Sequence, residues 1–100
     1  MFQFIKKMDD IKKRLDNNEQ LFIVDVREED EFNSGHLPTA HSYPLSMLKD
    51  ITHSLPNDRM LYIYCRSGQR AQTACNILQE LGFTQVENIG GIIHWKYDVI

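Results

Sequence analysis

A cysteine followed closely by two arginines is the feature of this sequence best suited to chemistry. Residues 65–70 read Cys-Arg-Ser-Gly-Gln-Arg. An apolar run over 60–64 precedes them and a helical pattern begins at about residue 70, so the segment is expected to join a strand to a helix. Backbone N–H groups in such a turn can point inward, and the helix N-terminus adds partial positive charge. The segment is therefore predicted to form an anion-binding cradle.

This cradle would favour the thiolate of Cys65, because hydrogen-bond donors and nearby cations stabilise the negative form. Arg66 and Arg70 supply the positive charge, and the hydroxyl of Ser67 can donate a further hydrogen bond. Gly68 permits the dihedral angles that a tight ring of amides requires. A thiolate that attacks a sulfane sulfur would become a persulfide, which can pass its sulfur to a second acceptor. No histidine base is needed for this two-step chemistry.

Other interpretations of the two cysteines are weaker. A cysteine after a strand is more commonly a small buried hydrophobic residue, but the arginines and glycine that follow Cys65 are poorly explained by packing. Cys75 falls on the apolar face of the helix that follows, so we expect it to be buried and inert. The spacing of the cysteines is not that of a zinc site, and two are too few for a disulfide scaffold. Neither a metal nor a cofactor is expected.

Alternating strands and helices are predicted to position the cradle. Strands are expected over 2–5, 21–26, 40–43, 60–64 and 86–89, and helices over 9–16, 28–33, 45–55 and 70–81, with a short terminal helix through Trp95. This order indicates an α/β fold with a mainly parallel sheet. Ligands of such sheets bind beyond the carboxyl ends of the strands, and both Asp25 and Cys65 fall at such ends.

The composition is that of an ordinary globular protein. The chain has 100 residues, a net charge of -3, 42% hydrophobic and 25% charged residues, so we expect one domain over residues 1–100. No basic and aromatic stretch suited to nucleic acid is present. No segment approaches the roughly 18 apolar residues of a membrane span, and no signal peptide is apparent. A cytoplasmic location with free thiols is expected.

Four blocks of residues, in order along the chain, resemble the rhodanese-like domain family. The blocks are Asp25-Val26-Arg27 with Glu31-Phe32, Gly35-His36-Leu37-Pro38 and Ala40; Pro44-Leu45; residues 65–70; and Gly90-Gly91 with Trp95. The resemblance spans nearly the whole chain. It implies a three-layer α/β fold in which helices flank both faces of a five-stranded, mainly parallel sheet.

The resemblance also implies a sulfurtransferase that acts through a persulfide on Cys65. The residues implied to bind the substrate or the persulfide are Arg66, Ser67, Gly68, Gln69 and Arg70. The sulfur donor would be a small molecule such as thiosulfate or polysulfide, or a protein persulfide, and the acceptor cyanide or a thiol.

Three further residues are expected to support the site. Asp25 and Arg27 are read as mainly structural, with Arg70 or a loop amide as the partner of the Asp25 carboxylate. His36 is expected to fix its loop by hydrogen bonding to backbone, and Trp95 to pack in the core. Thr39 departs from the family, which commonly has glycine there. Glu31 is acidic where thiosulfate-specific relatives tend to carry a cation, which weakens the case for thiosulfate.

Three alternatives to a sulfurtransferase remain open. The first is a cysteine phosphatase, whose loop places five residues between cysteine and arginine; here four separate Cys65 from Arg70. The second is a regulatory binding module, although many such modules lack the cysteine. The third is a persulfide carrier, which keeps the chemistry and changes only the acceptor.

Overall fold

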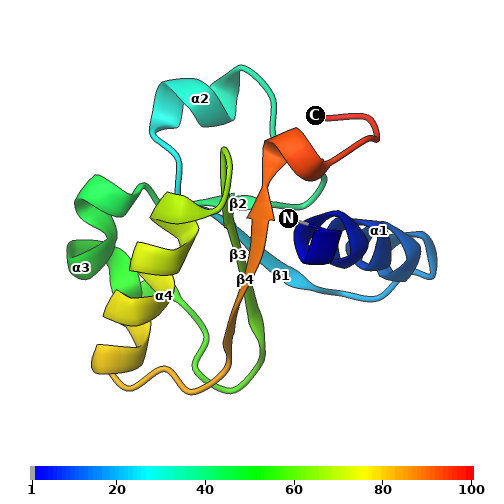
Figure 1. Ribbon diagram of the computed structural model, residues 1–100. Helices are drawn as coiled ribbons and strands as arrows, with labels where there is room; N and C mark the ends of the chain where they lie inside the picture. Colours follow the sequence, from blue (N-terminus) through cyan, green and yellow to red (C-terminus); the bar gives the residue numbers. More distant parts are fainter. Residues whose placement is uncertain (1) are drawn as a thin grey trace.

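A computed structural model describes residues 2–100 as a parallel sheet with helices on both of its faces (Figure 1). The helices and strands are α1 (Phe2–Asp16), β1 (Phe22–Asp25), α2 (Glu29–Asn33), β2 (His41–Ser42), α3 (Leu48–Ile51), β3 (Leu61–Cys65), α4 (Gln69–Glu80) and β4 (Val86–Gly91). The strand order is β2-β1-β3-β4, and every neighbouring pair is parallel. The predicted α/β fold is confirmed.

Four strands, rather than five, form the sheet in the described part of the chain. The strand expected over residues 2–5 was wrong, because these residues belong to α1. Phe4 continues the helical stripe of Met8, Ile11 and Leu15 one turn toward the N-terminus, and that stripe faces the sheet. Read alone, four mostly apolar residues resemble a strand, and only the longer period identifies them as helix.

The sheet divides the interior into two apolar clusters, because successive side chains of a strand point to opposite faces. Figure 1 shows α1 on one face and α3 with α4 on the other. The cluster beneath α3 and α4 includes Val24, Leu48, Leu61, Ile63, Cys65, Ala71 and Leu78. The cluster beneath α1 includes Met8, Ile11, Ile23, Leu37, Tyr62, Tyr64, Ile89 and Trp95. The expected packing role of Trp95 is confirmed.

The helix expected over 45–55 is broken into three short pieces. A 3-10 turn at Leu45–Met47 leads into α3, and a second one at Thr52–Ser54 follows it. Thr, His and Ser are weak helix formers. Leu55 is extended, as the residue before a proline usually is. No helix in residues 2–100 is long and apolar enough to cross a membrane.

The end of α4 follows the predicted pattern. Gly82 has a φ of +99°, and its N–H donates to Gln79 O while Phe83 N–H donates to Leu78 O. These two bonds satisfy carbonyl groups at the helix end, and glycine adopts the left-handed conformation at little cost. At Gly82 the chain thereby leaves α4 and turns toward β4.

Candidate active site

Cys65 is the last residue of β3, at the carboxyl end of the sheet, where the loop to α4 begins (Figure 1). Its side chain points to the α4 face and is 1% exposed. The pairing of β3 with β4 shifts register between Ile63 and Tyr64, so that Ile89 is an additional residue on β4. Such bulges re-aim the residues that follow them. Cys65 consequently pairs with Gly91, whose lack of a side chain leaves room for the loop.

Two backbone N–H groups point at the sulfur of Cys65. Gly68 N lies 3.1 Å from Sγ, and Ala71 N lies 3.3 Å from it. Gly68 has a φ of +106° and is the N-cap residue of α4, so the left-handed conformation of this glycine begins the helix. Donors of this kind stabilise an anionic sulfur in surroundings that are otherwise apolar.

The remaining residues of the predicted cradle contribute less to the sulfur than expected. The side chains of Arg66, Ser67 and Gln69 are exposed, and no hydrogen bond joins them to Sγ. Ala71, the second donor, lies one residue beyond the predicted segment. It belongs to the first turn of α4, where backbone N–H groups lack partners within the helix. The helical pattern after residue 70 was therefore the signal that could have identified it.

Arg70 is held by Glu31 of α2. Arg70 NH1 lies 2.7 Å from Glu31 Oε1 and NH2 lies 3.0 Å from Oε2. The backbone N–H of Glu28 donates to Glu31 Oε1 at 3.1 Å. Hydrogen bonding from Arg70 lowers the pKa of Glu31 to about 2. Hydrogen bonding to Glu31 likewise raises the pKa of Arg70.

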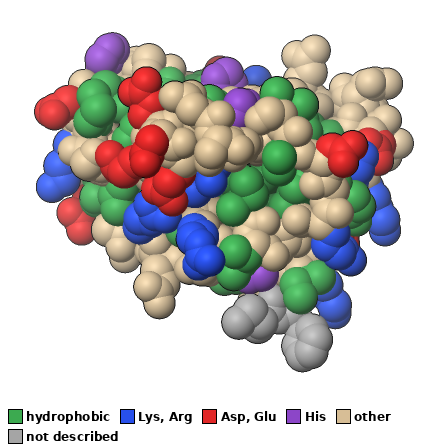
Figure 2. Space-filling model, turned by 90° about the horizontal axis from the view of Figure 1, so that it is seen from above, with side chains coloured by type: hydrophobic (Ala, Val, Ile, Leu, Met, Phe, Trp, Pro, Cys, Tyr) green, Lys and Arg blue, Asp and Glu red, His purple; other side chains and the backbone are tan. Residues whose placement is uncertain are grey.

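Figure 2 looks down on this end of the molecule and shows acidic and basic side chains side by side. Residues 28–31 are all acidic, and Glu31 among them binds Arg70 of the loop. The surface around the loop therefore carries carboxylates beside its cations, and it is not uniformly positive.

Asp25 forms a buried ion pair with Arg27. Of the two partners expected for its carboxylate, a loop amide is confirmed, that of Arg27, whereas Arg70 was wrong because it binds Glu31. Asp25 is 0% and Arg27 5% exposed. Arg27 NH2 lies 2.7 Å from Asp25 Oδ2, and the backbone N–H of Arg27 donates to Oδ1 at 2.9 Å. Burial opposes the charged form of Arg27, but its bonds to Asp25 prevail and raise its pKa.

Tyr64 completes this buried network. Its hydroxyl donates to Asp25 Oδ2 at 2.6 Å and accepts the N–H of Leu37 at 3.1 Å. Burial, and then the charge of Asp25, raise the pKa of Tyr64. Arg27 NH2 also donates to Gly35 O at 2.7 Å. The network thereby joins the end of β1 to the loop that follows α2. It includes Tyr64, the residue that precedes Cys65.

His36 contacts the backbone, as predicted. Its Nδ1 lies 3.1 Å from Phe32 O, and its ring stacks on that of Phe32 with centroids 3.8 Å apart. The backbone of His36 exchanges two hydrogen bonds with Ile100. His36 therefore joins the loop after α2 to the C-terminal residue, and it makes no contact with the Cys65 sulfur.

Cys75 is buried on the apolar face of α4, 4% exposed. Burial raises the pKa of its thiol to about 11. In the described part of the chain both cysteines are free. A neutral thiol is a poor nucleophile, so Cys75 is not expected to take part in the chemistry expected of Cys65.

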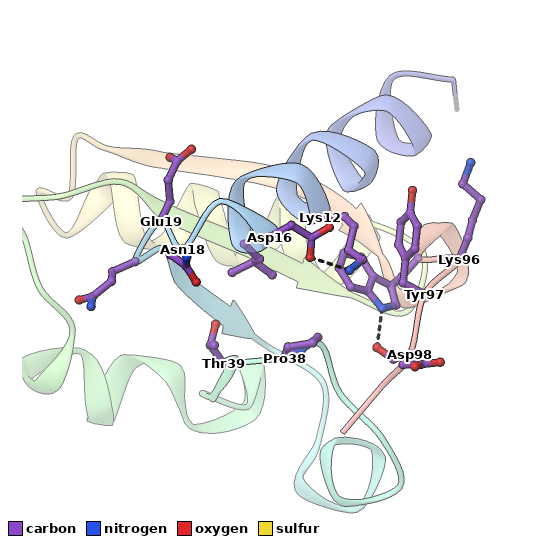
Figure 3. A pocket seen from close by; sticks show the side chains of 12 residues that line it. Lys12, Asp16, Asn18, Glu19, Pro38, Thr39, Lys96, Tyr97 and Asp98 are labelled. Atoms are coloured by element: carbon purple, nitrogen blue, oxygen red, sulfur yellow. Dashed lines mark hydrogen bonds and ion pairs between the residues drawn. The ribbon is translucent and has the colours of Figure 1, made fainter.

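A cavity of about 730 Å³ lies away from Cys65. Figure 3 shows that the end of α1, the loop at Pro38 and Thr39, and the segment from Lys96 to Asp98 surround it. Lys12 and Asp16 form an ion pair of 2.7 Å there. None of residues 65–70 lines this cavity.

Comparisons with known proteins agree with this geometry. A family model of the rhodanese-like domain matches residues 7–98. A sulfurtransferase of Allochromatium vinosum is 37% identical over 86 residues, which cover 85% of this chain and 80% of that protein. A Bacillus subtilis protein whose name proposes a sulfur-carrier role is 33% identical over 78 residues, 78% of this chain and 42% of its own length. The crystal structure of a rhodanese-like domain protein from Staphylococcus aureus has a TM-score of 0.81 at 29% identity, and the match covers 88% of this chain and 86% of that chain.

Proposed function

Because this chain belongs to the rhodanese-like domain family, we propose that it transfers sulfane sulfur through a persulfide on Cys65. One observation carries the proposal: the N–H groups of Gly68 and Ala71 point at Sγ, 3.1 Å and 3.3 Å away. A buried cysteine with a purely packing role does not require such donors. They suit a Cys65 sulfur that is a thiolate before it accepts a second sulfur and again after it has passed that sulfur on.

The proposed reaction has two displacement steps. In the first, the Cys65 thiolate attacks the sulfane sulfur of the donor, and the bond from that sulfur to the rest of the donor breaks. Thiosulfate would release sulfite with the bonding electron pair, and Cys65 would become a persulfide. In the second step, cyanide or a thiolate attacks the terminal sulfur, and the Cys65 thiolate leaves. The two N–H donors face Sγ, which carries the negative charge in the thiolate state and again when the thiolate leaves in the second step.

The charges around Cys65 favour a donor less anionic than thiosulfate, such as a protein persulfide. Arg27 is neutralised by Asp25 and Arg70 by Glu31. Arg66 is exposed, and three further acidic residues, 28–30, precede Glu31. A dianion such as thiosulfate that approaches the loop meets less positive charge than the sequence of the loop suggests. We expect Glu31→Gln, which frees Arg70, to lower the KM for thiosulfate about threefold to tenfold while the KM for a protein persulfide changes little.

A persulfide carrier is the second candidate, since it would use the same Cys65 chemistry and pass the sulfur to a protein. The resemblance to a protein named as a sulfur carrier favours it. A phosphatase is disfavoured, because only four residues separate Cys65 from Arg70 and because Glu31 engages the guanidinium that a phosphate would need. A regulatory module without chemistry would leave the donors on Sγ unexplained.

Intact mass spectrometry tests the proposal directly. The protein is exposed to thiosulfate or polysulfide, separated from the reagent, and weighed before and after cyanide. We expect a gain of one sulfur atom that cyanide removes, that Cys65→Ser abolishes and that Cys75→Ala retains. If Cys65→Ser still gained a cyanide-labile sulfur, Cys65 would not be the carrier. If the wild-type protein gained none from either donor, the proposed function would be wrong.

A further inference from the structure

The N-terminal helix contacts the loop that carries the sulfur donors. Phe4, a half-buried residue of α1, lies against two glycines. A methyl group on Gly68 would come within 2.9 Å of Phe4 Cε2, and one on Gly90 within 2.6 Å of Phe4 Cγ. On a third side the ring centroid of His94 lies 5.3 Å from that of Phe4. The Phe4 ring thus fills a slot that stays open only because both neighbours are glycine.

Gly68 is the residue whose position matters most for the sulfur. Its N–H donates to Cys65 Sγ at 3.1 Å. Its carbonyl oxygen accepts hydrogen bonds from Asn88 Nδ2 at 3.0 Å and from Gln72 N at 3.1 Å. A shift of this residue would therefore move an N–H donor away from the sulfur.

The loop is bounded at both of its ends. At its start, Gly91 of β4 lies so close to the Arg66 carbonyl that a methyl group on Gly91 would come within 1.9 Å of the oxygen. The N–H of Ile93 donates to the same oxygen at 3.2 Å. At the other end of the loop, the Phe4 ring packs against Gly68. Phe4 thus restrains the part of the loop that provides the donor.

Phe4 is itself firmly placed, because α1 is anchored to the sheet one turn later. Lys7 Nζ donates to Asn88 O at 3.2 Å and pairs with Glu87 at 3.3 Å. Met8, in the next turn, is 0% exposed. The matched family range begins at residue 7, so the Phe4 contact lies outside what family membership supplies.

We propose that Phe4 is a positioning residue for sulfur transfer, which holds the Gly68 N–H on the Cys65 sulfur. The proposal rests on the proposed function of Cys65. Donors accelerate a reaction when they are held in place before the charge develops. Without the ring, Gly68 gains freedom and its N–H spends less time on Sγ. The expected result is a fall in kcat of about tenfold with little change in KM, because the exposed residues of the loop, Arg66, Ser67 and Gln69, are unaltered.

The test compares Phe4→Ala and Phe4→Leu with Leu15→Ala. Leu15 is a half-buried residue near the other end of α1 and packs against the apolar cluster beneath α1, so its truncation weakens the helix without touching the loop. The first readout is kcat and KM with polysulfide as donor and cyanide as acceptor. The second is the hydrogen-exchange rate of the Gly68 amide, followed by NMR on the unloaded thiol at a temperature where all variants are folded.

We expect Phe4→Ala to lower kcat about tenfold and to raise Gly68 exchange by a similar factor, with Phe4→Leu in between. Leu15→Ala should lower Tm but leave both quantities at wild-type values. Unchanged Gly68 exchange in Phe4→Ala, or equal effects of Phe4→Ala and Leu15→Ala, would overturn the inference. If Phe4→Ala does not fold, Phe4→Leu decides by the same two readouts. A wild-type protein that takes up no sulfur would contradict the proposed function, whereas Gly68 exchange would still report on Phe4.

Discussion

At the scale of single residues, the buried carboxylate of Asp25 shows why charge near this site requires a matched partner. Its oxygens accept hydrogen bonds from Arg27 and from the Tyr64 hydroxyl. A buried charge that loses its partner retains the full cost of its desolvation. The pair therefore acts as a unit, and the loss of either member leaves the other in apolar surroundings.

We predict that Asp25→Ala lowers the free energy of unfolding by about 3–5 kcal/mol, because it leaves the Arg27 guanidinium buried without a counterion. Tyr64→Phe removes one hydroxyl and should cost about 1–2 kcal/mol. Urea unfolding measures both values. A loss below about 1 kcal/mol for Asp25→Ala would mean that Arg27 reaches solvent in the variant, and that the pair does not hold the end of β1.

Glu31 should make stability depend on pH in acid. Hydrogen bonds from Arg70 lower its pKa from 4.5 to about 2 in the folded protein. A carboxylate whose pKa is lower in the folded than in the unfolded protein stabilises the fold at pH values above its unfolded pKa. This contribution is lost as the pH falls through the folded pKa. We therefore predict that above pH 5 the free energy of unfolding of the wild type exceeds that of Glu31→Gln by about 1 kcal/mol. The difference is small because the ion pair with Arg70 is partly exposed.

The same comparison supplies its own control, because Gln is close to Glu in shape and still accepts the Glu28 N–H. Urea unfolding at a series of pH values should show the two proteins converging between pH 4.5 and about 2. A difference that stays constant over this range would assign the effect to packing rather than to the charge of Glu31.

At the scale of elements, the turn that leads into β2 contains a strained residue. Thr39 has a φ of +67°, a conformation that is costly for a β-branched side chain. Its side chain is exposed, and no hydrogen bond from it is present. The backbone bond from Ala40 N–H to Leu37 O closes the turn, and a glycine at position 39 would allow the same turn without the strain.

We predict that Thr39→Gly raises the free energy of unfolding by about 0.5–1 kcal/mol, because relief of the left-handed strain exceeds the added freedom of the unfolded chain. Thr39→Ala retains a Cβ and should gain less. Thermal unfolding of the two variants measures the difference. Equal stability of the Gly and Ala variants would show that the backbone conformation carries no penalty at this position.

The elements also show what the sequence could and could not predict. The strands around 22–25 and 61–65 and the helix after residue 69 could be predicted, because each has a strong apolar period and a clear boundary such as Gly82. Residues 2–5 could not be assigned alone, since their helical period appears only with Met8 and Ile11. The helix over 45–55 was overestimated, because apolar spacing does not reveal weak helix formers within it.

The candidate site was predictable in part for a similar reason. Cys65, the proposed nucleophile, and its loop occupy one continuous segment, so their types and spacing were visible in the sequence. The partners of Asp25 and Arg70 were not, because Tyr64 and Glu31 approach from other elements. Phe4 is separated from Gly68 by most of the chain, and no local pattern connects them.

At the scale of the whole molecule, one sheet separates two apolar clusters, and both of them support the site. Cys65 and Ala71 belong to the cluster beneath α3 and α4, while Tyr64 belongs to the cluster beneath α1. Adjacent residues of β3 therefore anchor in opposite halves of the molecule. Loss of packing on one face of the sheet should therefore destabilise the cluster on the other face as well. Unfolding should be a single cooperative transition.

Leu78→Ala tests this coupling. Leu78 of α4 is 0% exposed, so its truncation should cost about 2–5 kcal/mol. Trp95, the one tryptophan of the chain, lies in the opposite cluster. We predict that its fluorescence transition in urea shifts by the same amount as the far-UV circular dichroism transition.

Leu81→Ala is the matched control: Leu81 is 52% exposed and should change stability by less than about 0.5 kcal/mol. If Leu78→Ala moved the dichroism transition and left the Trp95 transition in place, the two faces would unfold separately, and the sheet would not couple the sulfur-bearing face to the network around Asp25.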